Sequence, residues 1–424
     1  MAEPPKGRIT AALRHRDFAL LWSGQLVSLA GDGIFTVALP LEVLRQTGRA
    51  FDLGIVVTAR TVPAVLLLLA GGALVDRLSR RLVMLVSDLC CAVAVGLVAV
   101  LMATGRAGLW ELAALSAVFG VASAFFKPAS SAVVPEVLPA ELLVSAGSLS
   151  SLSHSVAKYL LGPLAGGVLV AAIGNTWAFG LNAVSFAASA VCLALMRRTP
   201  RPEPSGGTLV DGIREGLRYC RSVPWLWWSM IAVGIANITC YAPITVLLPV
   251  LVKDVFHGGA VALGALFAAG GVGGALAAAS AGRRPPRRRM TAIWAAWSGV
   301  GAATVALALA PWVWLSAVFT AAAWFGMSYG NILWYSLMQR ELRPEMLGRA
   351  ASVDSALSLA LTPLGTLVGG AAAGLVDVRL TLVVGGLATA GTAAVLLVPG
   401  VRDPDRPAQP PGSRTLDPSG IVLS

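Results

Sequence analysis

Charged residues are scarce in this sequence: only 12% of its 424 residues are Asp, Glu, Lys or Arg, whereas 56% are hydrophobic. Soluble domains carry about 25% charged residues, so the composition excludes a water-soluble protein. Acidic residues are the scarcer sign, with 21 against 32 basic residues and a net charge of +11. The basic residues lie in short loops between apolar runs, which is typical of membrane orientation signals. We therefore expect the lipid bilayer, and no nucleic acid, as a partner.

Cysteine and histidine are too few and too scattered for a metal site or a disulfide framework. The five cysteines show no C-x-x-C spacing, and four of them lie within apolar runs, so we expect free thiols. The three histidines form no cluster with Asp or Cys, which argues against a membrane-embedded enzyme. No G-x-x-x-x-G-K segment followed by Ser or Thr occurs, so the chain brings no ATPase of its own. We expect a non-enzymatic protein without a metal or another cofactor.

Long apolar runs are the main feature of the sequence. A helix needs about 20 apolar residues to cross about 30 Å of hydrocarbon. Twelve runs of at least this length predict an all-α membrane protein, with spans at 18–44, 53–75, 82–104, 109–128, 146–172, 174–196, 225–252, 259–281, 290–310, 312–337, 351–376 and 378–398.

The distribution of Lys and Arg predicts the orientation of these spans. If both termini are cytoplasmic, 25 of the 32 Lys and Arg residues fall on the inner side and 5 in the outer loops. By the positive-inside rule we expect a multi-pass protein of the cell inner (plasma) membrane with both termini in the cytoplasm.

The longest stretch between spans divides the chain into two halves. It begins as a Pro-rich linker and continues as a helix with Leu209, Ile213 and Leu217 on one face. The predicted organisation is a cytoplasmic N-terminus (1–17), an N-terminal six-helix bundle (18–196), a cytoplasmic linker with an amphipathic helix (197–224), a C-terminal six-helix bundle (225–398) and a disordered cytoplasmic tail (399–424).

The two halves are related at a spacing of about 200 to 210 residues, as expected for parallel repeats of a transporter. The arginine-rich loop at 72–81 corresponds to that at 282–289, and the segment 139–149 parallels 344–353. A proline-glycine stretch follows the second landmark in each half.

The loop between the second and third spans carries residues through which the sequence resembles the major facilitator superfamily. The signature of that family matches Gly72, Leu74, Asp76, Arg77, Arg80 and Arg81. The resemblance covers essentially all twelve spans and implies the family's fold, in which twelve transmembrane helices form two pseudo-symmetric six-helix halves. It also implies that the loop is a cytoplasmic latch, in which the Asp lies near a helix terminus and the arginines pair with carboxylates. The second copy of the loop has no Asp, so any latch there must be built differently.

Two further carboxylates lie near the ends of spans. Asp88 is shallow in the third span, and we expect it to join the latch network with Arg77, Arg81 and Glu136 in a gating role. Glu42, at the outer end of the first span, is expected to be a solvated rim residue.

Four stretches, at 24–41, 179–186, 331–340 and 344–352, look most like the branch of this superfamily that contains macrolide-efflux proteins and the enterobactin exporter. The resemblance implies export of a small hydrophobic or amphiphilic substrate, such as a drug, antibiotic or siderophore, by proton antiport with alternating access. It also implies a monomer. An importer or facilitator of a small metabolite is the alternative, because the fold permits it equally.

The fifth span contains a stretch that resembles the signature of proton-coupled antiporters. It consists of Gly162, Pro163, Gly166 and Gly167. Proline removes a backbone donor and small residues permit close helix approach, so this stretch can bend against a neighbour. The alternative is simple close packing. The upstream small position of the signature is occupied by Lys158, which weighs against strict proton antiport.

Ionisable side chains within spans are costly and usually functional. Asp32, near the middle of the first span, is the first candidate for proton coupling, and the alternative is a permanent ion pair to a neighbouring helix. Arg60 and Lys158 are both possible counter-ions, and His154 precedes Lys158 by one helical turn. Asp354, early in the eleventh span, is either a second coupling group or a helix-start charge.

An amphiphilic substrate needs aromatic surfaces and a few hydrogen-bonding groups in a largely apolar cavity. The tenth span is the richest source of both. The candidates are Asn182, Asn237, Tyr241, Trp324, Asn331, Trp334, Tyr335 and Gln339. For each aromatic residue the alternative is that it packs against neighbouring helices or lies at the membrane interface and does not contact the substrate.

Overall fold

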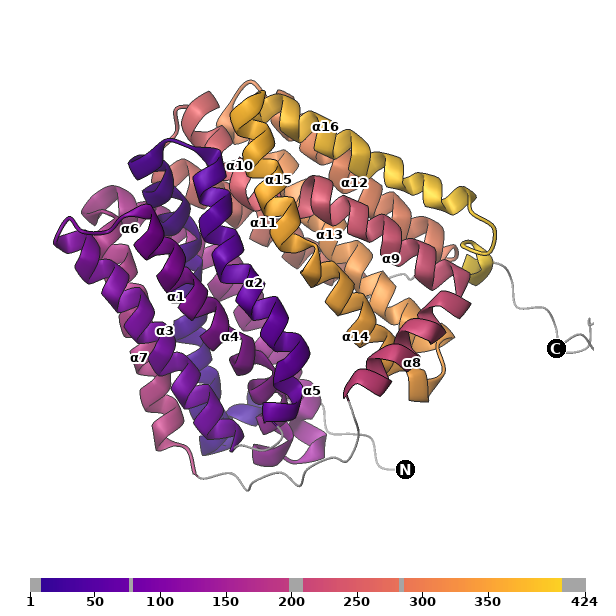
Figure 1. The fold of residues 1–424 in the computed structure, drawn as a ribbon. Coiled ribbons are helices and arrows are strands. Elements are labelled where there is room, and N and C mark those ends of the chain that lie inside the picture. Colours follow the sequence, from indigo (N-terminus) through magenta and orange to yellow (C-terminus); the bar gives the residue numbers. More distant parts are fainter. Residues whose placement is uncertain (1–8, 76–78, 198–208, 282–285, 406–424) are drawn as a thin grey trace, which may run out of the picture.

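The computed structural model describes residues 9–75, 79–197, 209–281 and 286–405, and these are almost entirely helical (Figure 1). The first half comprises η1 (Ile9–Arg14), α1 (Arg16–Thr47), α2 (Ala50–Val75), α3 (Arg80–Ala103), α4 (Leu109–Val137), η2 (Ala140–Leu142), α5 (Leu143–Ser153), η3 (His154–Leu161), α6 (Gly162–Ile173) and α7 (Asn175–Leu195). The second half comprises α9 (Pro224–Ala236), η4 (Asn237–Tyr241), α10 (Ile244–Val250), η5 (Leu251–Val255), α11 (Ala260–Ala281), α12 (Arg289–Leu309), α13 (Val313–Glu341), α14 (Pro344–Ala360), α15 (Thr362–Leu375), α16 (Val378–Gly391) and η6 (Thr392–Leu397).

Eleven helical segments of the described residues are long and apolar enough to cross a membrane. The remaining span predicted from the sequence, 312–337, coincides with α13, which has 29 residues and is long enough to cross. Asn331, Trp334 and Tyr335 lower the hydropathy of this helix, and all three are among the residues that the sequence assigns to a substrate cavity.

Several spans depart from regular α-helix. The fifth span passes from α5 through the π-helical η3 into α6: the N–H of Gly162 donates to the carbonyl of Ala157, five residues back, and Pro163 follows without a donor of its own. The corresponding span of the second half breaks at Leu361, between α14 and α15, just before Pro363. The seventh span contains the π-helical segments η4 and η5.

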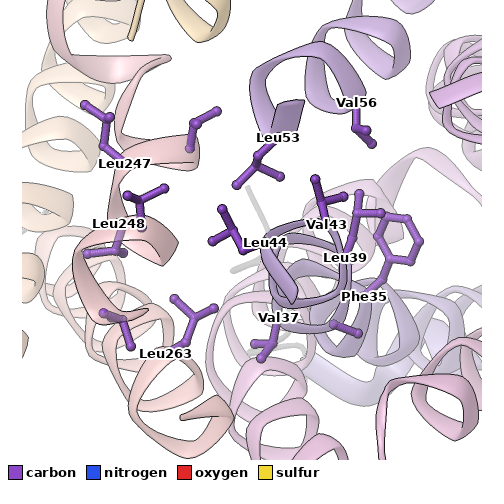
Figure 2. Close-up of a cluster of buried hydrophobic side chains, with 14 of the residues drawn as sticks. Phe35, Val37, Leu39, Val43, Leu44, Leu53, Val56, Leu247, Leu248 and Leu263 are labelled. Atoms are coloured by element: carbon purple, nitrogen blue, oxygen red, sulfur yellow. The ribbon is translucent and has the colours of Figure 1, made fainter. Parts of the chain in front are cut away.

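The two halves pack together at one end of the bundle. Figure 2 shows the apolar cluster there, in which Phe35, Val37, Leu39, Val43 and Leu44 of α1 and Leu53 and Val56 of α2 approach Leu247 and Leu248 of α10 and Leu263 of α11. Thr58 Oγ1 lies 2.8 Å from Thr366 Oγ1 across the α2–α15 contact. The other large buried clusters belong to one half each. In Figure 1 the ribbons of the halves diverge toward the end that carries α5 and α8 (Leu209–Ser222).

Helix α8 lies where the sequence predicts an amphipathic helix. It packs against α14 and α9. The Arg349 Nη1–Glu215 Oε1 distance is 2.6 Å, and the Arg221 guanidinium lies 5.0 Å from the centre of the Trp227 ring. Burial raises the pKa of the Cys220 thiol to about 11, which keeps it protonated at neutral pH.

The first residues of the predicted disordered tail, 399–424, are folded instead. The short η7 (Asp403–Asp405) places Asp405 at the amino end of α12. The carboxylate accepts hydrogen bonds from the backbone N–H of Met290 at 2.7 Å and of Thr291 at 2.9 Å, and from the Thr291 hydroxyl at 2.6 Å. Asp405 therefore supplies a carboxylate beside the second arginine-rich loop, which has none of its own. Residues 406–424 lie outside the described range.

Replacing Asp405 by Ala should lower the free energy of unfolding by about 1 kcal/mol, the usual cost of losing a helix cap. The measurement is SDS-induced unfolding of the purified protein, followed by tryptophan fluorescence. The matched control is Asp254→Ala, because Asp254 is exposed and makes no side-chain hydrogen bond to the described residues. Equal stability of the two variants would contradict a capping role.

Candidate functional site

Asp32 lies in α1 between two glycines, each of which faces a different neighbouring helix. Gly31 faces α7: a Cβ there would overlap the side chains of Asn182 and Ser185. Gly33 faces α6: a Cβ there would lie 2.7 Å from the α-carbon of Gly162. The backbone around Asp32 is thus held between two helices at distances that only glycine allows.

The Asp32 carboxylate pairs with Lys158 of η3. Lys158 Nζ donates to Asp32 Oδ2 at 3.2 Å, and the exposed fractions of the two side chains are 27% and 15%. Asp32 Oδ1 is buried without a hydrogen-bond partner among the described residues. The other possible counter-ion, Arg60, lies over the rings of Phe119 and Phe35, at 4.3 and 5.4 Å from their centres. Of the two cations, the structure brings Lys158 to Asp32.

His154 begins the π-helical segment but does not reach across to Asp32. Its Nδ1–H donates to the carbonyl of Ser150 at 3.0 Å, and the residue is exposed. Its charge environment includes Lys158, Lys127 and Asp32. The structure therefore places His154 beside the Asp32–Lys158 pair rather than in it.

The glycines of the fifth-span motif form a crossing point of three helices. Gly162 and Gly166 lie against α1, where Cβ atoms would meet Gly33 and Ile34 at under 3 Å. Gly167 lies against α11 of the other half, where a Cβ would be 2.7 Å from the carbonyl oxygen of Ala260. The motif therefore packs closely on both sides, and it connects the neighbourhood of Asp32 to the interface between halves.

The described part of the predicted latch is a set of contacts at the start of α3. Arg80 Nη1 lies 2.6 Å from Glu136 Oε1 and donates to the carbonyl of Ala132 at 2.7 Å. Arg81 donates to the carbonyls of Leu193 and Ala194 at the carboxyl end of α7, at 2.7 and 2.5 Å, where a cation is favourable. Gly72 lies within α2, whereas Asp76 and Arg77 lie outside the described residues.

Among the described residues Asp88 forms no ion pair with Arg81 or with the Arg80–Glu136 pair, and its expected partner Arg77 lies outside the described residues. It is 2% exposed and lies near Ser189 of α7 and within electrostatic range of Asp32, and its Oδ2 is buried without a hydrogen-bond partner among the described residues. Sequence position gave its depth but not the direction of its side chain, which points between α3 and α7. The expectation for Glu42 was wrong: this side chain is 1% exposed and is bonded to Arg45, Gln46 and Asn175.

A cavity of about 230 Å³ lies in the second half between α9, η4, α12, α13, α14 and α15. Six of the residues named from the sequence line it: Asn237, Tyr241, Asn331, Trp334, Tyr335 and Asp354. Sequence reasoning missed Trp297 of α12, together with Ser358 and Thr362 on either side of the break at Leu361. No local pattern marks Trp297, because its place depends on how α12 packs against α13.

Three of the residues named for the cavity lie elsewhere. Trp324 packs against Gly270, where its ring fills the contact between α13 and α11. Gln339 is exposed near the end of α13. Asn182 is fully buried in α7, next to Gly31, and its backbone carbonyl accepts a hydrogen bond from Ser185 at 2.7 Å.

The sequence matches the family model described as Major Facilitator Superfamily over residues 21–359. It is 31% identical to the multidrug efflux pump Tap of Mycolicibacterium fortuitum, over 83% of this chain and 87% of the relative. It is 27% identical to the enterobactin exporter EntS of Citrobacter koseri, over 94% of each chain, and 24% identical to macrolide efflux protein A of Streptococcus pyogenes, over 83% and 88%. These relatives confirm the branch that the sequence resembles.

Solved structures confirm the fold. The nucleoside transporter NupG superposes with a TM-score of 0.72 at 11% identity, covering 90% of this chain and 99% of that one. A bacterial homologue of ferroportin in an inward-facing state gives 0.71 at 18% identity, covering 90% and 98%.

A Gly33→Ala substitution should destabilise the protein by about 1–3 kcal/mol, because the new methyl group forces α1 away from Gly162. The matched control is Gly180→Ala in α7, where a Cβ would meet nothing within 4 Å and alanine is the better helix former. SDS unfolding should therefore separate the two variants. A Gly33→Ala protein as stable as the control would refute the close crossing of α1 and α6.

The Asp32–Lys158 pair should show energetic coupling in a double-mutant cycle. Removing one charge leaves the other unpaired in a poorly hydrated site. We expect Asp32→Asn and Lys158→Gln together to destabilise less than the sum of the single changes, with an interaction energy of about 0.5–3 kcal/mol. The matched control is the exposed pair of Arg349 and Glu215, which should couple by less than about 1 kcal/mol. Additive effects at Asp32 and Lys158 would disprove the pairing.

Proposed function

The chain belongs to the major facilitator superfamily, and we propose that it exports a small hydrophobic or amphiphilic compound in exchange for protons. Three relatives are similar to this chain over most of its length. Their names describe a multidrug efflux pump, an enterobactin exporter and a macrolide efflux protein. The single observation that carries the coupling proposal is the contact of Asp32 with Lys158 within the membrane-spanning part of the first half.

Protonation of Asp32 is the proposed coupling event. A neutral Asp32 no longer attracts Lys158, so the pair lasts only while the carboxylate is charged. Lys158 is part of η3, whose next residues form the glycine crossing with α1 and α11. A change at the pair can therefore alter the packing of α6 against the other half, which is the interface that alternating access requires to move.

The orientation follows from the basic loops, and we place both termini in the cytoplasm of an inner-membrane protein that works as a monomer. The apolar cluster of Figure 2 then lies at the outer end, and the halves diverge toward the cytoplasm. This arrangement corresponds to an inward-open state. In this orientation, Arg80, Arg81 and Glu136 form part of a cytoplasmic latch, with Asp76 and Arg77 proposed as its remaining members.

Export should be measured as the accumulation of ethidium, a fluorescent hydrophobic cation, in cells that express the protein. The wild type should lower ethidium accumulation, and a protonophore should abolish the difference because it removes the driving gradient. Asp32→Asn should abolish it as well, since an amide cannot release a proton. Asp254→Asn is the matched control, an exposed carboxylate in η5 of the second half, and should behave as wild type.

Accumulation above that of cells without the protein would instead indicate an importer. Export that survives both the protonophore and Asp32→Asn would overturn proton coupling through this residue. Equal expression and membrane localisation of the variants are checked by immunoblot of the membrane fraction.

A further inference from the structure

The cavity of the second half is built where two spans lose their regular helical form. Asn237 and Tyr241 belong to the π-helical η4, and Ser358 and Thr362 flank the break between α14 and α15. Irregular backbone at membrane depth is tolerated where it lines a cavity or is buried in protein, and π-helical segments occur frequently at functional sites. Both irregular segments face the same space, which identifies that space as a site rather than a packing defect.

The cavity has one charge of its own. Of its lining residues, all within the described part of the chain, only Asp354 is acidic, and none is Lys, Arg or His. Asp354 is 8% exposed and accepts a hydrogen bond from Trp334 Nε1 at 3.4 Å, but it forms no ion pair with any described residue. Asp32 in the first half is paired with Lys158. The Asp354 carboxylate has no such partner among the described residues, so a ligand can supply the cation.

Two further polar groups of the lining lack partners. Tyr241 Oη and Trp297 Nε1 are both buried without a hydrogen-bond partner among the described residues. Buried polar groups are rarely left unpaired in folded proteins. Trp297 Nε1 lies against Gly330 of α13, whereas the Tyr241 hydroxyl is a donor at the cavity, so the complementary ligand atom there is an acceptor.

The walls are aromatic and held in place by their neighbours. Trp334 lies with its ring centre 5.6 Å from those of both Trp297 and Trp225, and Trp297 lies 5.3 Å from Trp294. Indole rings that are fixed in this way offer preformed faces to a cation, particularly to an alkylated ammonium group.

We propose that this cavity binds the charged group of an organic cation that carries a hydrogen-bond acceptor near its positive charge. This inference rests on the proposed function, in that the ligand is the exported compound. The Asp354 carboxylate neutralises the charge, Trp297 and Trp334 pack against its alkyl groups, and Tyr241 donates to the acceptor. Asp354 is then a substrate-binding residue and not a second proton-coupling group.

The volume limits how much of the ligand enters. A cavity of about 150 Å³ holds one benzene ring, and sites for whole drug-sized ligands span about 300–1,000 Å³. At about 230 Å³ the site accommodates an ammonium group with its acceptor and part of an attached ring. The remainder of a larger ligand extends out of the cavity.

The test is isothermal titration calorimetry of the purified full-length protein in lipid nanodiscs, without a proton gradient. Three probes are compared: benzoylcholine, which has a quaternary ammonium and an ester acceptor; (4-phenylbutyl)trimethylammonium, which has the charge without the acceptor; and benzoate, an anion. The wild type should bind benzoylcholine most tightly and benzoate least.

The variants assign this selectivity to residues. Asp354→Asn should weaken binding of benzoylcholine about tenfold or more, because it removes the counter-charge, whereas Asp354→Glu should retain most of the affinity. Tyr241→Phe should weaken benzoylcholine several-fold and leave (4-phenylbutyl)trimethylammonium unchanged, since only the acceptor loses a partner. Asp254→Asn is the control and should bind as wild type.

Affinity for benzoate equal to that for benzoylcholine, or binding by Asp354→Asn within twofold of the wild type, would overturn the inference. If Asp354→Asn fails to fold, as judged by SDS unfolding, Tyr241→Phe still decides: equal losses for the two cations would also overturn it. The calorimetry needs no proton gradient, so it tests binding independently of transport. If cells show no ethidium export but binding still depends on Asp354, only the proposed export function is overturned. If cells export ethidium but the purified protein shows no Asp354-dependent binding, only the proposed cation site is overturned.

Discussion

The absence of water from the hydrocarbon core is the constraint on which the rest of this structure depends. Each backbone N–H and C=O at membrane depth must be bonded within the protein, which leaves helices as the building unit. Departures from the helix are then informative. The segment η3 is pressed against α1 and α11, and η4 and the break at Leu361 border the cavity. The irregular segments therefore border two of the places where ionisable groups lie within the spans, those of Asp32 with Lys158 and of Asp354.

Close approach of small residues links the site of Asp32 to the interface between halves. Without a hydrophobic driving force in lipid, helices associate through packing at small residues. Gly33 against Gly162, and Gly167 against the Ala260 carbonyl, join α1, α6 and α11 into one stack. The same stack carries Asp32 on one side and, through η3, Lys158 on the other. A rearrangement of this ion pair cannot be absorbed locally, because no free space separates the backbones.

Sequence patterns predicted the number and approximate position of the spans, because hydropathy and length suffice for that, but they did not predict which side chains of a span line the cavity. Met327, Asn331 and Tyr335 recur every four residues on one face of α13 and line the cavity. Trp324 and Gln339 were chosen from the same helix, yet they lie above and below the cavity. Whether Arg60 or Lys158 is the counter-ion of Asp32 depends on tertiary packing. The same holds for Asp405, which caps a helix 115 residues away in the sequence.

Asp32 and Asp354, one in each half, differ in their partners, and this difference suits a division of labour. A carboxylate with a built-in cation, such as Asp32, changes its local attraction when a proton binds. A carboxylate without one, such as Asp354, is complementary to a charge brought from outside. If one residue served both purposes, substrate and proton would compete for it directly. With the two groups in separate halves, the proposed mechanism would transmit any competition through the contacts of α6 with α11 and of α2 with α15, which join the halves.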